Sequence, residues 1–522
     1  MKYTSLVRGS LKGSSHFPLP LPPQREIFMS IEVAEPVCQL TARLSKFMAR
    51  PQRHRLLHGY PLAAAMPYSD PQVRHRAANG DPAFVLPYNP QDTLLVGVLP
   101  HPFCNPKING CGFCTFPHET FSAAKSTTVV DAVTQEIDQR LAQQPEFRQA
   151  PVTEIYIGGG TANLTPAEPF RLLVRKLAEA FNVSKAEVSL EGVPRNFVPD
   201  NLRRGAPLLL DVMREEVPAR HFRISMGIQT FSEQRLEQMG RLAFGGSSTF
   251  VAAVEAAHGR GMTASGDLLF NLPAQSLTEM QADIQQAIDI GLDQICLYHL
   301  VMFRGLGTVW SRDAELLSNL PANDEAADNW LFLREYLIDR GFRQTSLTNF
   351  ERTELATDPR RYRYEQISYE SDRCQVLGFG PAGISYSSSD DGKYALKTMN
   401  PESSAEYLQA VGSMGPTWNR HFQYTPHDVQ LLHFTRRLAA LRIDKGTLSQ
   451  IHGPHAWDRY AERFHLLVAE GLLQESQQDY ALTPRGMFFS DSCAALLADS
   501  RRQTLSNAPL LAAANDNGSG FM

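Results

Sequence analysis

The stretch Cys104-Asn-Pro-Lys-Ile-Asn-Gly-Cys111-Gly-Phe-Cys114 places three of the chain's seven cysteines within eleven positions. It follows Leu94–Leu99, an apolar run of strand length. A structural zinc site usually has four ligands, whereas three thiolates can hold three irons of a [4Fe-4S] cluster and leave the fourth iron open. Two alternatives stay open: ordinary core cysteines, and a redox pair of Cys111 and Cys114 that gives Cys104 no role.

Outward from this stretch, apolar runs of strand length alternate with helical patterns over residues 94–300. The runs are Leu94–Leu99, Glu154–Ile157, Glu187–Leu190, Arg223–Ile228, Asp267–Leu272 and Gln294–Leu300. Repeated strand–helix units produce a parallel sheet, so the chain is predicted to be α/β, with a partial (β/α)6 barrel. Reactive groups in such barrels lie just after the carboxyl ends of the strands, and the cysteines do so here.

The segments between these runs carry helix signals. Val133, Ile137 and Leu141 recur at four-residue spacing, as one buried face of a helix requires. Thr165-Pro-Ala-Glu168 and Ser276-Leu-Thr-Glu279 each predict a capping box at a helix start.

The regular alternation of strand and helix patterns ends after residue 300. The glycine-rich stretch Leu377–Gly383 predicts a tight loop on the ligand side of the barrel. Thr425-Pro-His-Asp428 predicts a helix start, and Leu472–Glu475 with Tyr480–Leu482 predicts a hairpin, so the C-terminal part is expected to be mainly helical and winged-helix-like. The predicted units are a flexible leader (1–30), an N-terminal extension (31–93), the barrel (94–310), a barrel-closing region (311–420), the C-terminal domain (421–505) and a disordered tail (506–522).

Composition excludes several classes of function. With 20% charged and 43% apolar residues the chain is globular, and a formal net charge of −5 provides no basic surface for nucleic acid. No apolar run is long enough to span a membrane and no signal peptide is recognisable, so we expect a soluble cytoplasmic protein. Forty of the fifty basic residues are Arg, which suits bidentate capture of carboxylates, although biased codon usage is the preferred explanation of the skew.

A second motif, Ile157-Gly-Gly-Gly-Thr161, ends the second strand of the barrel. Glycine lets backbone N–H groups approach a ligand closely, such as the amino-acid part of a bound cofactor. Taken alone, it could equally be a simple turn.

Together these motifs resemble the radical S-adenosylmethionine (SAM) superfamily, and in particular its oxygen-independent coproporphyrinogen III oxidase-like family, which includes haem chaperones. The stretches that carry the resemblance over about residues 94–490 are Cys104–Cys114, Gly158–Thr161, Ser189–Pro194, Arg223–Phe231, Met239–Arg241, Asp267–Pro273, Leu297–Leu300, Gly378–Ser385 and Leu482–Gly486.

The resemblance implies an enzyme whose [4Fe-4S] cluster, held by Cys104, Cys111 and Cys114, cleaves SAM to a 5′-deoxyadenosyl radical. It implies an oxidoreductase acting on a tetrapyrrole or similar carboxylated substrate, with an electron donor such as flavodoxin or ferredoxin. Relatives with this architecture include haem chaperones, haem-opening methyltransferases and C-methyltransferases that consume two SAM molecules, so a haem carrier and a two-SAM methyltransferase are the alternatives.

The resemblance also assigns cofactor contacts. Gly159 and Glu191 match positions that bind the cleaved SAM, and Ile384 matches another cofactor contact. Positions that line a second SAM site in the family's oxidase are matched by Phe113, Gly160, Thr161, Gln229, Arg241, Asp267 and Val301. As to the physical basis, a carboxylate at a strand end can accept ribose hydroxyls or pair with an ammonium, and Arg241 can hold a carboxylate.

The sequence departs from the family at three places. Six residues separate the first two cysteines where the family has three, Val98 stands where the oxidase has Tyr, and Thr115-Phe116 stands where it has a further Cys. A longer loop adds little closure entropy, so cluster binding is expected to survive, but substrate access beside the cluster is expected to differ.

The remaining candidate ligands are scattered along the chain. His58, His101 and His118 are candidate haem or proton-transfer ligands, although isolated histidines are more often ordinary core or surface residues. The other four cysteines, Cys38, Cys296, Cys374 and Cys493, are predicted to be buried small hydrophobes.

Overall fold

The computed structural model of the chain describes residues 37–52, 60–61, 66–104, 111–116, 118–199, 206–413 and 415–506. The predicted leader and nearly all of the predicted tail lie outside these residues. None of the helices described is both long and apolar enough to cross a bilayer.

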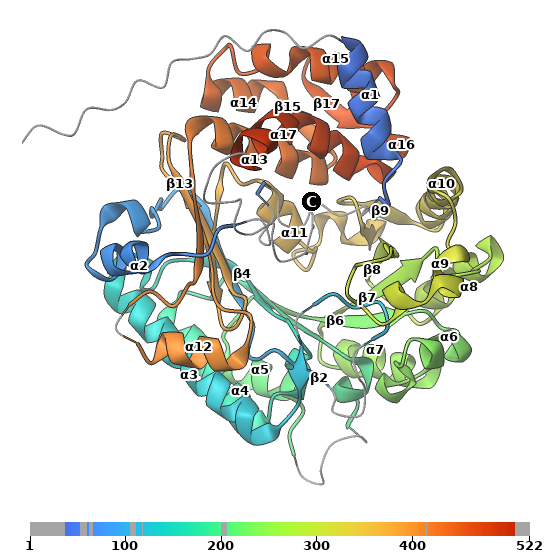
Figure 1. Cartoon of the computed structure of the whole chain (residues 1–522). Coiled ribbons are helices and arrows are strands. Elements are labelled where there is room, and N and C mark those ends of the chain that lie inside the picture. The colour runs from blue at the N-terminus through green and yellow to red at the C-terminus, as the bar shows by residue number, and fades with distance from the viewer. Residues whose placement is uncertain are drawn as a thin grey trace, which may run out of the picture.

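One large, curved sheet organises the described residues (Figure 1). Its strand order is β14-β13-β12-β11-β1-β4-β5-β6-β7-β8-β10-β9. The seven strands from β11 to β8 pair in parallel, and antiparallel strands extend the sheet at both ends. The strands of this sheet are β1 (Thr93–Val98), β4 (Val152–Ile157), β5 (Glu187–Gly192), β6 (His221–Gln229), β7 (Thr263–Phe270), β8 (Gln294–His299), β9 (Phe342–Gln344), β10 (Asn349–Arg352), β11 (Cys374–Phe379), β12 (Ile384–Ser388), β13 (Ala395–Met399) and β14 (Arg420–Tyr424).

The six predicted barrel strands are confirmed as β1, β4, β5, β6, β7 and β8, each within a few residues of its expected bounds. Helices connect them and cover the outer side of the sheet (Figure 1). These are α3 (Ala123–Gln143), α4 (Ala167–Ala180), α5 (Leu209–Glu216), α6 (Glu233–Gln238), α7 (Ser247–His258) and α8 (Leu277–Asp289). Val133, Ile137 and Leu141 are buried on α3, as their spacing predicted. The sheet is therefore the expected partial barrel, not a closed one.

The two predicted capping boxes have different outcomes. Ser276 and Glu279 form one at the start of α8. The box predicted at Thr165–Glu168 is wrong: α4 begins after Pro166 without a side-chain cap, because the Thr165 hydroxyl donates to the carbonyl oxygen of Ala162 at 2.7 Å and contacts a buried histidine.

The concave side of the sheet is polar, because alternate residues of each strand share one face. The register pairs Glu191 with Ser225 and Asp267 with Cys296 across neighbouring strands. The other face carries the apolar residues that pack under the helices, such as Leu190 and Ile224. The barrel strands thus present polar side chains to the interior and bury apolar ones outside it.

Residues beyond β8 close the barrel and connect it to the C-terminal unit. They include α9 (Ala314–Ser318), α10 (Asn323–Asp339), α11 (Tyr364–Tyr369) and α12 (Ser404–Val411). Helix α11 lies between the sheet and the C-terminal helices (Figure 1) and contacts β1, β11 and α13. The predicted glycine loop is half strand: residues 377–379 continue β11, and the loop itself covers residues 380–383.

The C-terminal unit has the expected helices followed by a hairpin. Thr425 and Asp428 form a capping box at the start of α13, and β16 pairs antiparallel with β17. Its elements are α13 (Pro426–Ala439), β15 (Arg442–Asp444), α14 (Lys445–His452), α15 (Ala461–Ala469), β16 (Leu473–Glu475), β17 (Asp479–Leu482), α16 (Pro484–Phe488) and α17 (Ser490–Ser506).

The N-terminal extension contributes α1 (Val37–Met48) and α2 (Pro71–Ala78). Helix α1 packs against α15 and α17 (Figure 1), and its residue Arg43 forms an ion pair with Asp499 at 2.5 Å. The helix before the hairpin, α15, is thus in contact with a helix from the other end of the chain.

Candidate active site

The three clustered cysteines lie where the barrel strands end. Cys104 ends the short strand β2 (Phe103–Cys104), and Cys111 and Cys114 belong to a turn in which the Cys114 N–H donates to the carbonyl oxygen of Cys111 at 2.9 Å. All three side chains are partly exposed. The residues between Cys104 and Cys111 lie outside the described part of the chain.

Gly112 fixes the turn between two other segments. Its N–H donates to the carbonyl oxygen of Met239 at 3.2 Å, and its own carbonyl oxygen accepts from the N–H of Trp310 at 2.9 Å. A Cβ atom at position 112 would overlap the indole of Trp310, so only glycine fits. The ring of Phe113 also meets that indole edge-on, with centroids 6.1 Å apart.

The thiols influence one another electrostatically. Burial raises the pKa of Cys104, and burial also raises the pKa of Cys114 to about 11, with the neighbouring thiols adding to both shifts. Such thiols remain protonated until a metal displaces the proton, so cluster binding would release protons.

The donor set at this turn is three thiols, which fits a [4Fe-4S] cluster with one open iron. Among the described residues, no three His, Cys, Asp or Glu side chains converge closely enough to hold one metal ion. A [4Fe-4S] cube instead takes thiolates from separate points around it. Burial and the neighbouring thiols raise the pKa of Cys104 and Cys114, yet the three thiols do not meet around one point, which is consistent with that arrangement.

The glycine motif docks directly onto the first cysteine. Gly159 and Gly160 have φ values of 83° and 54°, a conformation that favours glycine. Thr161 donates its N–H to the carbonyl oxygen of Phe103 at 3.0 Å, and its hydroxyl lies 3.5 Å from the Sγ of Cys104. The turn predicted to bind SAM is thus adjacent to the cysteines predicted to bind iron.

His101 has a structural role in this arrangement. It is fully buried, accepts from the N–H of Phe103 at 3.2 Å through Nδ1, and contacts the hydroxyl of Thr165 at 3.1 Å through Nε2. Burial lowers the pKa of His101 to about 4, so it is neutral at physiological pH. Its ring connects the cysteine strand to Thr165, four residues after the glycine motif, and its burial argues against haem ligation. His118 is exposed, and His58 lies outside the described residues.

Polar side chains from three further strands complete this end of the barrel. Glu191 is near the end of β5, Asp267 is in β7, and Gln229 ends β6 with a φ of 73°. Arg241 follows α6 and reaches back, donating from Nη1 to the Sγ of Cys111 at 3.0 Å and from Nη2 to the carbonyl oxygen of Gly227.

The other two residues predicted to contact a cofactor, Val301 and Ile384, lie on or beside other strands of the sheet. Val301 follows β8, and Ile384 begins β12 after the glycine loop. That loop approaches β1 closely, because a Cβ on Gly380 would overlap the carbonyl oxygen of Leu99. A Cβ on Gly159 would lie 2.7 Å from the Leu99 side chain, so Leu99 separates the two glycine segments.

A small apolar cluster lies beside the cysteine turn and is separate from the main core. Its buried members are Met239, Leu269, Leu272, Leu300, Met302 and Trp310, and Phe113 and Tyr298 pack against it. This end of the barrel therefore combines thiols, fixed charges and an apolar wall.

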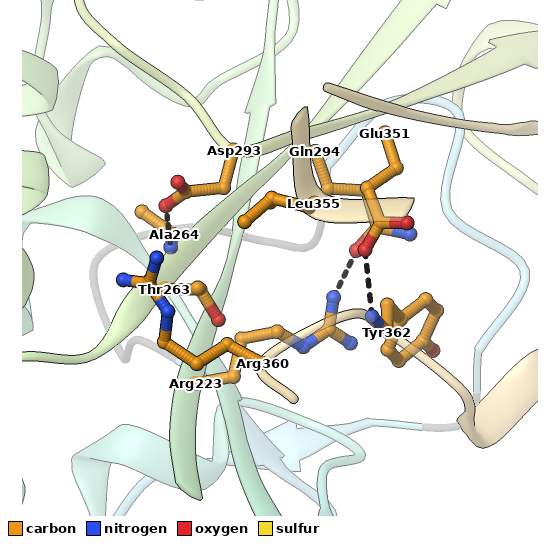
Figure 2. A pocket seen from close by; sticks show the side chains of 9 residues that line it. All are labelled: Arg223, Thr263, Ala264, Asp293, Gln294, Glu351, Leu355, Arg360 and Tyr362. Carbon is orange, nitrogen blue, oxygen red and sulfur yellow. Dashed lines mark hydrogen bonds between the residues drawn. The ribbon is translucent and has the colours of Figure 1, made fainter. Parts of the chain in front are cut away.

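The opposite end of the barrel holds a hollow with room for about one water molecule (Figure 2). It is lined by Arg223, Thr263, Ala264, Asp293, Gln294, Glu351, Leu355, Arg360 and Tyr362. Arg223 pairs with Glu187 at 3.3 Å, and its guanidinium lies 3.4 Å from the Tyr362 ring centroid. Arg223, Thr263 and Gln294 lie at or near the starts of β6, β7 and β8, so the hollow and its charged lining form a charged floor at the end remote from the cysteines.

Sequence reasoning missed two residues of the site, Tyr156 and Trp310. Tyr156 donates to Glu191, and Trp310 holds the cysteine turn. Position 156 could have been found, because it is two residues before Gly158 on the inward face of its strand. Trp310 depends on a contact some 200 positions away and had no local signal.

Among the other cysteines, Cys296, Cys374 and Cys493 are buried as predicted, but Cys38 is exposed. The prediction for Cys38 was wrong because α1 buries its other face, through Leu40, Leu44 and Phe47.

Comparisons with known proteins show which family and which fold the chain is similar to. Residues 98–287 match the radical SAM superfamily. The chain is 28% identical over 286 residues to anaerobilin synthase of Escherichia coli O157:H7, a match covering 54% of this chain and 59% of that protein. It is 21% identical over 391 residues to the haem chaperone HemW of Bacillus subtilis, covering 74% of this chain and 94% of the chaperone.

Among solved structures, coproporphyrinogen III oxidase of Escherichia coli superposes with a TM-score of 0.66 at 20% identity, over 84% of this chain and 96% of the oxidase. That likeness establishes the shared fold. Members of the radical SAM superfamily bind a [4Fe-4S] cluster and SAM, and the cysteines and the glycine motif here provide a matching set of groups.

Proposed function

Because this chain belongs to the radical SAM superfamily, in the coproporphyrinogen III oxidase-like family, we propose that it is an enzyme that cleaves SAM reductively and acts on a tetrapyrrole or similar carboxylated substrate. The observation that carries the proposal is the meeting of Cys104 with Thr161 at the end of the glycine motif, at the carboxyl ends of the strands. Cys104, Cys111 and Cys114 would hold the cluster.

A reduced cluster bound at these cysteines would supply the electron for reductive cleavage of the bond between the SAM sulfur and C5′, and with it the capacity to take a hydrogen atom from substrate. The chain's own groups orient the reactants. Gly159 and Gly160 allow the backbone to approach the amino-acid part of SAM, and Glu191 can accept hydrogen bonds from its ribose or pair with its ammonium.

Three observations support a tetrapyrrole-like substrate. Relatives named anaerobilin synthase and haem chaperone align with the chain. The apolar cluster around Trp310, against which the partly exposed Phe113 packs, lies beside the cysteine turn and would give an apolar side to a substrate bound there. The excess of Arg over Lys suits carboxylated side arms.

A haem carrier is the second candidate, favoured by the alignment with HemW over nearly the whole length of that chaperone. Such a carrier would bind haem stoichiometrically and consume no SAM in a reaction with substrate. A two-SAM methyltransferase would form S-adenosylhomocysteine together with 5′-deoxyadenosine, and that pair of products identifies it.

An electron donor of the flavodoxin or ferredoxin type and a cytoplasmic location belong to the same proposal. The three cysteines that would hold the cluster need to be reduced for it, as a reducing compartment favours.

Product analysis separates these functions. The reconstituted chain is incubated anaerobically with SAM, a reductant and either coproporphyrinogen III or haem, and the products are identified by mass spectrometry. A modified tetrapyrrole with 5′-deoxyadenosine supports the enzyme. Tight haem binding without formation of 5′-deoxyadenosine or S-adenosylhomocysteine supports the carrier and contradicts the proposed enzyme.

A further inference from the structure

Tyr156 connects the glycine motif to Glu191, whose carboxylate is predicted to bind SAM. It lies in β4, two residues before Gly158, and its hydroxyl donates to Oε2 of Glu191 on the neighbouring strand at 3.1 Å. Burial, together with the charge of Glu191, raises the pKa of Tyr156 well above its ordinary value. The phenol therefore keeps its proton and acts as a hydrogen-bond donor at any physiological pH.

The same contact explains the first glycine of the motif. A Cβ at position 158 would lie 2.5 Å from Oε2 of Glu191 and 2.7 Å from Cε1 of Tyr156. Even alanine would displace the carboxylate or the ring, because real Cβ atoms do not approach so closely. The ring, the carboxylate and the start of the glycine motif thus form one packed unit.

The barrel-closing region holds the Tyr156 ring from the other side. Tyr364, the first residue of α11, stacks on it with ring centroids 4.9 Å apart and an interplanar angle of 26°. The preceding residue, Arg363, pairs with Glu154 at 3.5 Å, and the N–H of Tyr362 donates to Glu351 at 2.6 Å. Tyr364 is therefore tied to the charged floor of the barrel, and little freedom remains for Tyr156.

We propose that Tyr156 is a positioning residue: its hydroxyl, held in place by the stacked ring of Tyr364, fixes the orientation of the Glu191 carboxylate that receives SAM. The inference rests on the proposed function and deepens it. A carboxylate whose orientation is fixed before the ligand arrives loses less freedom on binding, so its contribution to affinity is larger. Tyr156 acts through Glu191 and needs no contact with the reacting atoms.

The test compares substitutions that remove one feature at a time. Tyr156→Phe removes the hydroxyl and retains the ring, and we expect it to raise the KM and Kd for SAM about tenfold, with kcat within about twofold of the unsubstituted chain. Tyr364→Leu removes the stacking partner and is expected to shift KM in the same direction. Kd is measured by equilibrium dialysis against the cluster-loaded protein.

Tyr386→Phe is the matched control. Tyr386 is also buried, and its hydroxyl donates to the carbonyl oxygen of Ser371 at 3.2 Å, away from the cysteines and the glycine motif. It should leave both constants unchanged. Iron content and circular dichroism verify that each variant folds and holds its cluster.

The outcomes separate this inference from the function beneath it. If the unsubstituted chain binds SAM and Tyr156→Phe binds it equally well, or if Tyr386→Phe weakens binding as much, the positioning role is overturned and the proposed function stands. If the cluster-loaded, unsubstituted chain binds no SAM, both are overturned.

Discussion

The guanidinium of Arg241 donates from Nη1 to the Sγ of Cys111 across 3.0 Å. Its Nη2 donates to the carbonyl oxygen of Gly227, and its side chain is buried. The sequence resemblance assigned Arg241 to a second SAM molecule, whereas the structure places it on a predicted cluster ligand. A fixed positive donor beside a thiolate stabilises the more negative, reduced state of a cluster.

Arg241→Gln is therefore expected to lower the midpoint potential of the cluster by an amount on the order of tens of millivolts, because the thiolate loses a charged donor. A redox titration followed by electron paramagnetic resonance measures it. Arg235→Gln is the control, since Arg235 lies on the preceding helix and pairs with Glu279 at 3.0 Å. An unchanged potential in Arg241→Gln would remove the electrostatic role.

Gly112→Ala is expected to reduce the iron bound per chain by half or more, because the added methyl overlaps the Trp310 indole and displaces the cysteine turn. Trp310→Leu in the same chain frees space and should restore part of the iron. Iron and sulfide analysis after identical reconstitution measures both. Equal iron in Gly112→Ala and the unsubstituted chain would show that the turn accommodates the change.

Glu136→Ala is expected to destabilise the glycine loop by about 3 kcal/mol, because it leaves buried donors without an acceptor. The carboxylate of Glu136 accepts from the Gly380 N–H at 2.8 Å, from Asn400 at 2.7 Å and from the Tyr407 hydroxyl at 2.7 Å. Thermal unfolding measures the loss. Glu146→Ala, at an exposed position nearby in the sequence, should have little effect, and an equal loss in both variants would contradict the explanation.

Lys397→Met is expected to stabilise the protein in a pH-dependent way. Burial lowers the pKa of Lys397 to about 7, so the folded chain resists its protonation while the unfolded chain titrates near 10.4. The cost of the buried amine therefore grows as the pH falls from 10.4 to 7 and is constant below that. The gain in Tm should be about 5 °C at pH 7 and should shrink toward pH 10.

The matched control for that pH dependence is Lys393→Met, an exposed lysine just before the same strand. A gain that is equal at pH 7 and pH 10 would mean that Lys397 contributes through packing and not through its charge.

The sequence was informative where local pattern decides structure. All six barrel strands followed from apolar runs between helical segments. The structure places Cys104 after the first of them, at the carboxyl edge of the sheet, and its role as a cluster ligand stays a prediction. The capping box predicted at Thr165 failed because the Thr165 side chain contacts His101 instead of capping α4. Helix orientation exposed Cys38 in the same way.

Contacts between distant segments could not be predicted from the sequence. Tyr364 reaches Tyr156 only because the barrel-closing region folds back onto the concave side of the sheet. Trp310 meets Gly112, and Arg241 meets Cys111, through loops that come together at one end of the barrel. The roles of all three depend on the finished fold, and residue type alone carries no sign of them.

Reductive SAM cleavage is measured as the 5′-deoxyadenosine formed from SAM by the anaerobically reconstituted, reduced chain and by its cysteine variants. We predict cleavage by the unsubstituted chain and by Cys38→Ala, whose cysteine is exposed on α1, and its loss in Cys104→Ala, Cys111→Ala and Cys114→Ala. Undiminished cleavage by a chain in which all three clustered cysteines are replaced by Ala would contradict the account.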